Sequence, residues 1–273
     1  MSSKKPRAEI PRFATPIIET HCHLDYLTDA ALPEILARAA NAGVERSISI
    51  AVSPDNLGRV RDIAQSYPGV WGTQGIHPHE AESYTEEVAA ELREGLGDAR
   101  ILAVGEIGLD YHYDHADRAT QRRVFEEQLA LAAELDMPVV IHTREADDDT
   151  RDILRNHSQY LSRKGVIHSF TSSLALAEFC LEAGFCLGFN GIVTFNRAEN
   201  VRDVVRATPV DRILLETDSP YLTPVPYRGK ENAPCYLPFI AQCVAQLKTL
   251  DVEDLLASAY QNSLELFFNG EVT

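Results

Sequence analysis

Lysine is scarce in this sequence, and positive charge as a whole is in deficit. Only five of the 25 basic residues are lysines, and 41 acidic residues give a formal net charge of −16. Affinity for nucleic-acid phosphates comes largely from Lys and Arg, so this composition excludes a broad basic surface that coats a polynucleotide. A polyanionic ligand is therefore expected to be held locally, by metal or a few arginines. The acid excess is also compatible with a high-salt cytoplasm, although ordinary acidic enzymes look similar.

Cysteine motifs and long apolar runs are missing as well. The five cysteines are odd in number and have no CxxC spacing, which argues against a disulfide framework or zinc ribbon and for a reduced, cytoplasmic compartment. No apolar run approaches the ~18 residues of a membrane helix. Residues 1–16 contain no apolar signal core and are expected to form a flexible tail.

Short apolar runs alternate with longer amphipathic stretches along the rest of the chain, as is typical of βα units with a parallel sheet. The candidate strands lie at 17–21, 47–52, 70–75, 101–105, 139–142, 166–168, 185–189 and 213–216. The helices predicted among them include 30–42, 120–135 and 175–183, the last ended by Gly184. Two more are expected within 237–268, with Asp251 as the N-cap of the second.

Eight strands in 273 residues favour one (β/α)₈ TIM barrel over residues 17–273, an α/β fold. A doubly wound open sheet is the alternative. The chain is 45% hydrophobic and long enough to bury the core that either fold requires.

Unusual polar residues occur where these apolar runs end. They are His21 and His23 after the first run, His77 and His79 after the third, Glu106 after the fourth, His142 after the fifth, His168 after the sixth and Asp218 after the eighth. A lone histidine at a strand end is commonly structural, but six of the nine histidines share this position. Because the carboxyl ends of barrel strands meet in one mouth, the pattern predicts a metal site.

The residue types indicate which metals suit this site. Imidazole and carboxylate suit Zn, Mn, Fe or Co, and carboxylate with water suits Mg. His21 and His23 lie two residues apart on a strand and so share a face, whereas Cys22 between them points into the barrel wall. Four histidines with Glu106 and Asp218 exceed the needs of one ion and suit two ions bridged by a carboxylate. Hydrolysis by a metal-activated water would then need no Ser or Cys nucleophile.

These motifs resemble those of the TatD family of metal-dependent hydrolases. The matching segments are ETHCHLDYL, GIHPH, VGEIGLDYHYD, IHTREA, the region around His168, and LLETDSPYLTPVPYRGKENAP, in the family's order over nearly the whole chain. The resemblance implies an amidohydrolase-type TIM barrel and a divalent-metal phosphodiesterase. Such an enzyme is a 3′–5′ exonuclease or DNase that acts on single-stranded DNA or 3′ ends, and sometimes on RNA.

The resemblance also implies a cofactor of two divalent ions, Mg, Mn or Zn. Its ligands, carried over motif by motif, are His21, His23 and Asp218 for the first ion, His142 and His168 for the second, and Glu106 as a bridge between them. Glu106 and Asp218 are the catalytic candidates, because Asp218 would also orient the attacking water or accept its proton. No membrane contact and no obligate protein partner is expected.

Two candidates are expected to contact substrate phosphate. His77 follows the third strand, and Arg228 has the forked donor geometry that phosphate favours. Roles for His79 and Arg144 stay open. One departure affects the loop after His168, where SFTSS stands in place of the Cys-Phe-Ser-Gly common in the family. The other histidines are expected at the surface: His112, His115 and His157.

Two other functions stay open. The acidic composition favours hydrolysis of another ester or amide in the same metal site, such as deacylation of aminoacyl-tRNA. No lysine ends a predicted strand, which weighs against the carbamylated bridge of cyclic-amide hydrolases. The non-enzymatic alternative is a metal-stabilised scaffold or an accessory of protein export.

Overall fold

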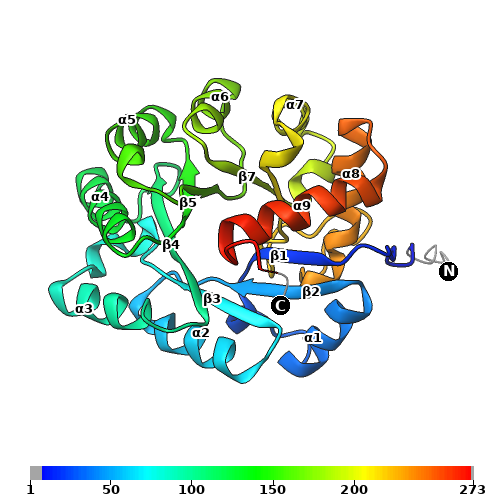
Figure 1. Ribbon diagram of the computed structural model, residues 1–273, viewed down its shortest axis with the longest axis horizontal. Helices are drawn as coiled ribbons and strands as arrows, with labels where there is room; N and C mark the ends of the chain where they lie inside the picture. The colour runs from blue at the N-terminus through cyan, green and yellow to red at the C-terminus, as the bar shows by residue number, and fades with distance from the viewer. Residues whose placement is uncertain (1–7, 272–273) are drawn as a thin grey trace.

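Eight parallel strands pair in chain order in the computed structural model, which describes residues 8–271 (Figure 1). They are β1 (Ile17–Cys22), β2 (Val44–Ser49), β3 (Val70–Gln74), β4 (Ile101–Asp110), β5 (Val139–Arg144), β6 (Gly165–Ile167), β7 (Cys186–Phe189) and β8 (Ile213–Leu215). Their residues are mostly buried, as expected for parallel strands covered by helices. The order β1 to β8 confirms the predicted (β/α)₈ barrel.

The barrel closes between the carboxyl end of β1 and the residues just beyond the end of β8. The amide of Asp218 donates to the carbonyl of His21 at 2.9 Å, and the amide of His23 donates to the carbonyl of Ser219 at 2.8 Å. Cys22 forms a parallel bridge with Ser219 and is fully buried, as predicted for a residue of the barrel wall. The first and last strands therefore bring two predicted ligand segments into direct contact.

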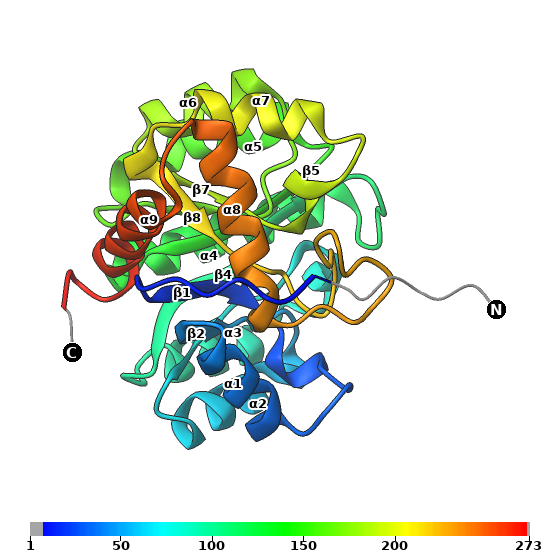
Figure 2. The ribbon, with the colours of Figure 1, turned by 90° about the vertical axis from the view of Figure 1, so that its right-hand side faces the viewer.

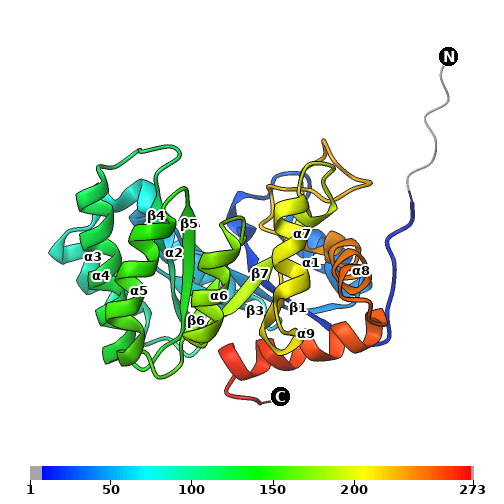
Figure 3. The ribbon, with the colours of Figure 1, turned by 90° about the horizontal axis from the view of Figure 1, so that it is seen from above.

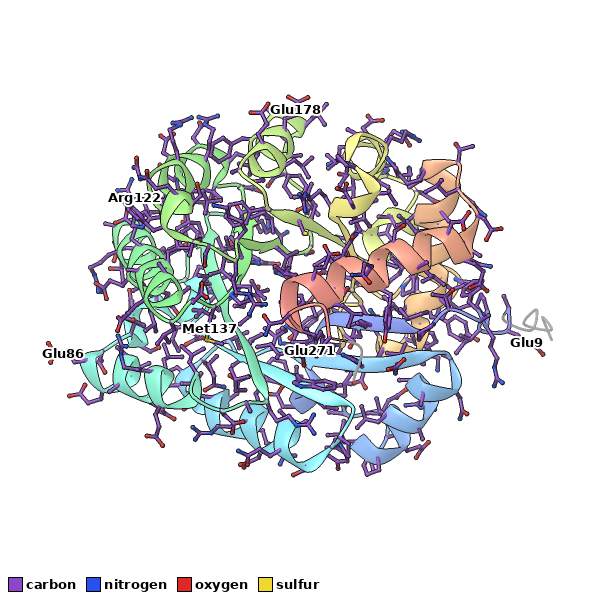
Figure 4. All side chains as sticks on the ribbon, in the orientation of Figure 1. Glu9, Glu86, Arg122, Met137, Glu178 and Glu271 are labelled. Atoms are coloured by element: carbon purple, nitrogen blue, oxygen red, sulfur yellow. The ribbon has the colours of Figure 1, made fainter. Side chains whose placement is uncertain are left out.

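Helices follow the strands and surround the barrel. They are α1 (Leu32–Asn41), α2 (Pro54–Ser66), α3 (Glu86–Gly95), α4 (Arg118–Glu134), α5 (Asp147–His157), α6 (Leu174–Glu182), α7 (Glu199–Ala207), α8 (Leu237–Lys248) and α9 (Val252–Phe267). Asp251 caps α9 as predicted, since its side chain accepts the amide of Glu253 at 2.8 Å. Gly184 follows α6 with φ of +92°, a conformation that favours glycine. Figure 4 shows Glu86, Arg122 and Glu178 pointing outward from this layer.

Helix α9 packs against β1 and β8 at one end of the barrel, and the loops that follow the strands project from the opposite end (Figure 3). The amino ends of the strands lie on the α9 side, so the loops at the other end belong to the carboxyl ends of the strands. Within residues 8–271, no helix is long and apolar enough to span a bilayer.

The largest differences from the predicted strand boundaries are in β2 and β4. Strand β2 spans Val44–Ser49 where 47–52 was predicted, and β4 continues past Glu106 to Asp110. The pairing of β4 with β5 shifts register between Val104 and Ile107, and this bulge lets β4 continue instead of ending at Gly105. Glu106 therefore lies inside a strand, at an irregularity that redirects its side chain.

The predicted tail, residues 1–16, is described only in part, since residues 1–7 lie outside the described residues. Residues 8–16 form neither helix nor strand. The amides of Ala14 and Thr15 donate to the Glu253 carboxylate at 2.8 and 2.9 Å, which attaches this segment to the start of α9.

Candidate metal centre

The carboxylate of Glu106 lies at the centre of a cluster of imidazoles. Its Oε1 is 2.8 Å from His168 Nε2, 3.1 Å from His142 Nδ1 and 3.4 Å from His77 Nε2, and its Oε2 is 3.4 Å from His21 Nε2. Burial raises the pKa of Glu106, but the His168 and His77 imidazoles outweigh burial and hold it well below its usual range. Glu106 is therefore an anion with its two oxygens directed at different histidines.

His21, His23 and Asp218 lie on the Oε2 side of Glu106. His21 is in β1, His23 follows that strand directly, and Asp218 is in the loop after β8. Asp218 Oδ1 is 3.5 Å from His23 Nε2 and 3.7 Å from His21 Nε2. His23 Nδ1 is 3.3 Å from the carbonyl of Ile50, which holds its proton there and leaves Nε2 free to act as a ligand. Burial raises the pKa of Asp218, but His23 and His21 bring it below its usual value.

On the other side of Glu106, Asp110 fixes the orientation of His142. His142 Nε2 donates to Asp110 Oδ2 at 2.9 Å, so the Nδ1 lone pair faces Glu106. His79 Nε2 lies 3.1 Å from the same oxygen. Asp110 was not among the residues singled out from the sequence; it lies in the segment VGEIGLDYHYD, at the end of β4.

Two further buried carboxylates lie beneath the centre, and neither was singled out in the sequence. Glu216 Oε1 accepts the Ser169 amide and lies 3.6 Å from His168 Nδ1. Glu19 accepts the amides of His21 and Thr217, and burial raises its pKa to about 8. Glu19 and Glu216 lie in or beside apolar runs, and the sequence does not show how deeply a polar residue in such a run is buried inside the barrel.

His77 is positioned to donate a hydrogen bond. Its Nδ1 accepts the backbone amide of His79 at 3.1 Å, so the neutral ring carries its proton on Nε2. Burial lowers the pKa of His77 well below the usual value, which keeps this ring neutral. Its Nε2–H faces the Glu106 side of the mouth, where a lone pair would be needed for metal ligation.

The remaining candidates lie around this cluster. Arg228 stacks on Phe195 with its guanidinium carbon 3.8 Å from the ring centroid, outside the histidine cluster. Arg144, at the end of β5, stacks on Tyr113. His112 pairs with Glu145 and is 39% exposed, as expected for a surface residue.

The donor set fits divalent metal ions. His142 Nδ1 and His168 Nε2 lie 3.3 Å apart, and both approach the same oxygen of Glu106. Both ring nitrogens of His21 are buried without a hydrogen-bond partner among the described residues. Buried polar atoms are normally satisfied, and a cation held between these nitrogens and Glu106 would satisfy them. Three sets within the described residues meet the distances for metal ligation: His21, His23 and Glu106; His77, Glu106 and His142; and His21, His168 and Glu216. His77 meets them by distance alone, because the proton on its Nε2 occupies the position of the lone pair.

Comparison with known proteins identifies the family of this chain. The family described as TatD related DNase matches residues 18–268. The chain belongs to the TatD family. This TatD-family chain is 37% identical over 254 residues to YabD of Bacillus subtilis, named an uncharacterized metal-dependent hydrolase, with 92% of this chain and 98% of that protein covered.

A second relative of this TatD chain has a more specific name. The 3′–5′ ssDNA/RNA exonuclease TatD of Erwinia tasmaniensis is 36% identical over 240 residues, which cover 86% of this chain and 92% of that protein. The crystal structure of the TatD homologue YjjV from Escherichia coli matches with a TM-score of 0.88 and 33% identity, over 92% of this chain and 98% of that one. This TatD-family chain is a metal-dependent hydrolase.

Proposed function

We propose that this protein is a two-metal exonuclease that removes nucleotides from the 3′ ends of single-stranded DNA, and of RNA, by hydrolysing phosphodiester bonds. The direction and substrate are inferred from the Erwinia tasmaniensis relative, whose name specifies a 3′–5′ ssDNA/RNA exonuclease. The chemistry is inferred from the residues of the metal centre.

One observation carries the proposal: the two oxygens of Glu106 face two different sets of ligands. Oε2 faces His21, and beyond it lie His23 and Asp218. Oε1 faces His142 and His168. A carboxylate in this position suits a bridge, with one ion held by His21, His23 and Asp218 and the other by His142 and His168. When bound, such ions lower the pKa of water and neutralise charge on the transferring phosphoryl group.

Asp218, His77 and Glu106 have different roles in this proposal. Asp218 is the most exposed carboxylate of the centre, at 14%, and it is anionic, so it can orient the attacking water and accept its proton. His77 donates from Nε2 to a non-bridging phosphate oxygen. Glu106 stays ionised because its imidazole neighbours lower its pKa.

A panel of substrates tests the proposal. Protein cleared of metal with chelator is reloaded with Mg, Mn or Zn and given single-stranded DNA and RNA with 5′ labels, a DNA blocked at its 3′ end, and an aminoacyl ester. The expected result is progressive shortening of the unblocked strands, absent in chelator.

Three results would contradict parts of this proposal. If every metal-loaded form leaves both nucleic acids intact, the nuclease assignment is wrong. Faster hydrolysis of the aminoacyl ester than of either nucleic acid would replace the proposal with an esterase. Cleavage of the 3′-blocked strand at an equal rate would contradict the exonucleolytic direction.

A further inference from the structure

A second hollow opens at the carboxyl end of the barrel, between the loops after β6, β7 and β8. It is a cavity of about 460 Å³ lined by Thr171, Val225 and Arg228 and by residues of the segment 192–201. Thr171 follows His168 by three residues, and Val225 follows Asp218 by seven. The lining therefore comes from the loops that carry on from His168 and Asp218, yet none of the predicted metal ligands lines the cavity.

The walls of this cavity are held in place by hydrogen bonds. The loop between β7 and α7 is bonded to Arg202, whose guanidinium donates to the carbonyl of Phe195 at 2.7 Å. It is joined to the loop after β8 where the amide of Val225 donates to Thr194 Oγ1 at 3.0 Å. Both loops project on the side away from α9 (Figure 2). The cavity is consequently formed before any ligand arrives.

A glycine allows the two loops to approach this closely. A Cβ atom placed on Gly191 would lie 1.9 Å from the carbonyl oxygen of Leu222, in the loop after β8. No side chain fits at that distance, because ordinary carbon–oxygen contacts are more than an ångström longer. Gly191 therefore fixes the spacing of the walls.

Two arginines at this cavity have no carboxylate partner within the part of the chain that the structure describes, although the chain has a net charge of −16. Arg197 and Arg228 line the cavity, and neither has an ion pair with a carboxylate within residues 8–271. The neighbouring carboxylate of Glu199 is instead bonded to Arg202 and Arg206, each at 2.8 Å. The positive charge of Arg197 and Arg228 is thus available to an anionic ligand.

The remaining lining divides into an apolar floor and a polar rim. Ile192, Phe195 and Val201 supply apolar surface, and one face of Phe195 carries the Arg228 guanidinium. Asn196 and Asn200 lie at the rim, exposed, with no side-chain hydrogen bond among the described residues. An apolar floor beside these two arginines and the exposed amides matches a base joined to a phosphate.

We propose that this cavity binds one nucleotide unit of the substrate strand that lies outside the cleaved linkage. Its base packs on the apolar floor, and its phosphate is held by Arg197 and Arg228. This inference rests on the proposed nuclease function and adds a specificity site to it. In this proposal the cleaved phosphate lies at Glu106, and Arg228 contacts a neighbouring phosphate of the same strand instead of the cleaved one.

The test compares a long substrate with a short one. The ratio of kcat/KM for a single-stranded decanucleotide to that for a dinucleoside monophosphate reports binding beyond the cleaved linkage. Asn196→Asp places a negative charge at the rim without changing side-chain size, and Val225→Glu does so from a second wall. Asn156→Asp, an exposed change in α5 distant from the mouth, is the matched control.

Both rim variants are expected to lower this ratio about fivefold or more, the effect of losing contacts to one base and its phosphate. Their rates on the dinucleoside monophosphate and their metal content are expected to match those of the wild type. If both variants keep the wild-type ratio, as Asn156→Asp should, the cavity proposal is overturned while the nuclease function stands. If the wild-type enzyme cleaves neither substrate, the proposed function fails instead.

Discussion

The hydrogen bond between Asp110 and His142 gives the most specific prediction about this metal centre. Asp110 Oδ2 accepts from His142 Nε2 at 2.9 Å, and Oδ1 accepts the backbone amides of His112 and Tyr113 at 3.0 and 3.1 Å. Both oxygens of the buried carboxylate are therefore acceptors. Burial raises the pKa of Asp110, but the bonds from His142 and His79 outweigh burial and keep it ionised.

Replacing Asp110 by asparagine removes one acceptor while keeping the size of the side chain. If the amide nitrogen faces His142, the imidazole must accept at Nε2, and its proton moves to Nδ1, where it blocks metal ligation. If the amide is turned the other way, its N–H groups oppose the amides of His112 and Tyr113. Loss of such a supporting partner weakens metal binding about 10- to 100-fold, which corresponds to roughly 1.4–2.8 kcal/mol.

The assay is a Mn²⁺ titration of chelator-treated protein with two readouts, the heat of binding measured by calorimetry and the rate of turnover. We expect Asp110→Asn to shift both curves to higher metal concentration, with much of the turnover regained at saturation. Asp114→Asn is the matched control, because this exposed carboxylate in the loop after β4 pairs with Arg118 at the start of α4 and with none of the candidate ligands. A Mn²⁺ affinity in Asp110→Asn equal to that of the wild type would refute the tautomer argument.

Three further changes separate the roles of other residues. Glu106→Gln keeps the shape of the proposed bridge without its charge, so turnover should fall at least about a hundredfold. The control Glu178→Gln, on the outer helix layer, should have no effect. A Glu106→Gln enzyme with wild-type turnover would contradict the bridge. His77→Ala should lower kcat/KM about 10- to 100-fold through loss of a hydrogen bond to charged phosphate, with metal content unchanged; loss of metal would show that His77 is a ligand. Asp251→Ala should lower the free energy of unfolding by about 1 kcal/mol, measured in urea, through loss of the α9 cap; unchanged stability would mean that the cap is redundant.

The barrel could be predicted from sequence because eight apolar runs alternate with amphipathic stretches, and the cluster because polar residues end those runs. Glu106, His142 and His168 share that pattern, and the common mouth of a barrel brings them together. Asp110 could not be found in this way, because the fourth strand was predicted to end at residue 105. In the structure β4 continues through a bulge between Val104 and Ile107 and ends at Asp110. A hydrophobic alternation that extends through Ile107 and Leu109 was the available signal.

Other parts of the site depend on contacts between segments distant in sequence. Glu19 and Glu216 lie near each other only because the barrel closes between β1 and β8. The cavity between the loops after β6, β7 and β8 depends on how closely Gly191 approaches Leu222, and no local pattern encodes that distance. Arg228 was selected for its guanidinium, whereas its position against Phe195 required the folded loops.

The central claim is that Glu106 joins two metal ions, and anomalous diffraction from crystals soaked in Mn²⁺ tests it most directly. Two anomalous peaks are expected to flank the Glu106 carboxylate, one beside His21, His23 and Asp218 and the other beside His142 and His168. A single peak, or a pair of peaks that Glu106 does not contact, would contradict it.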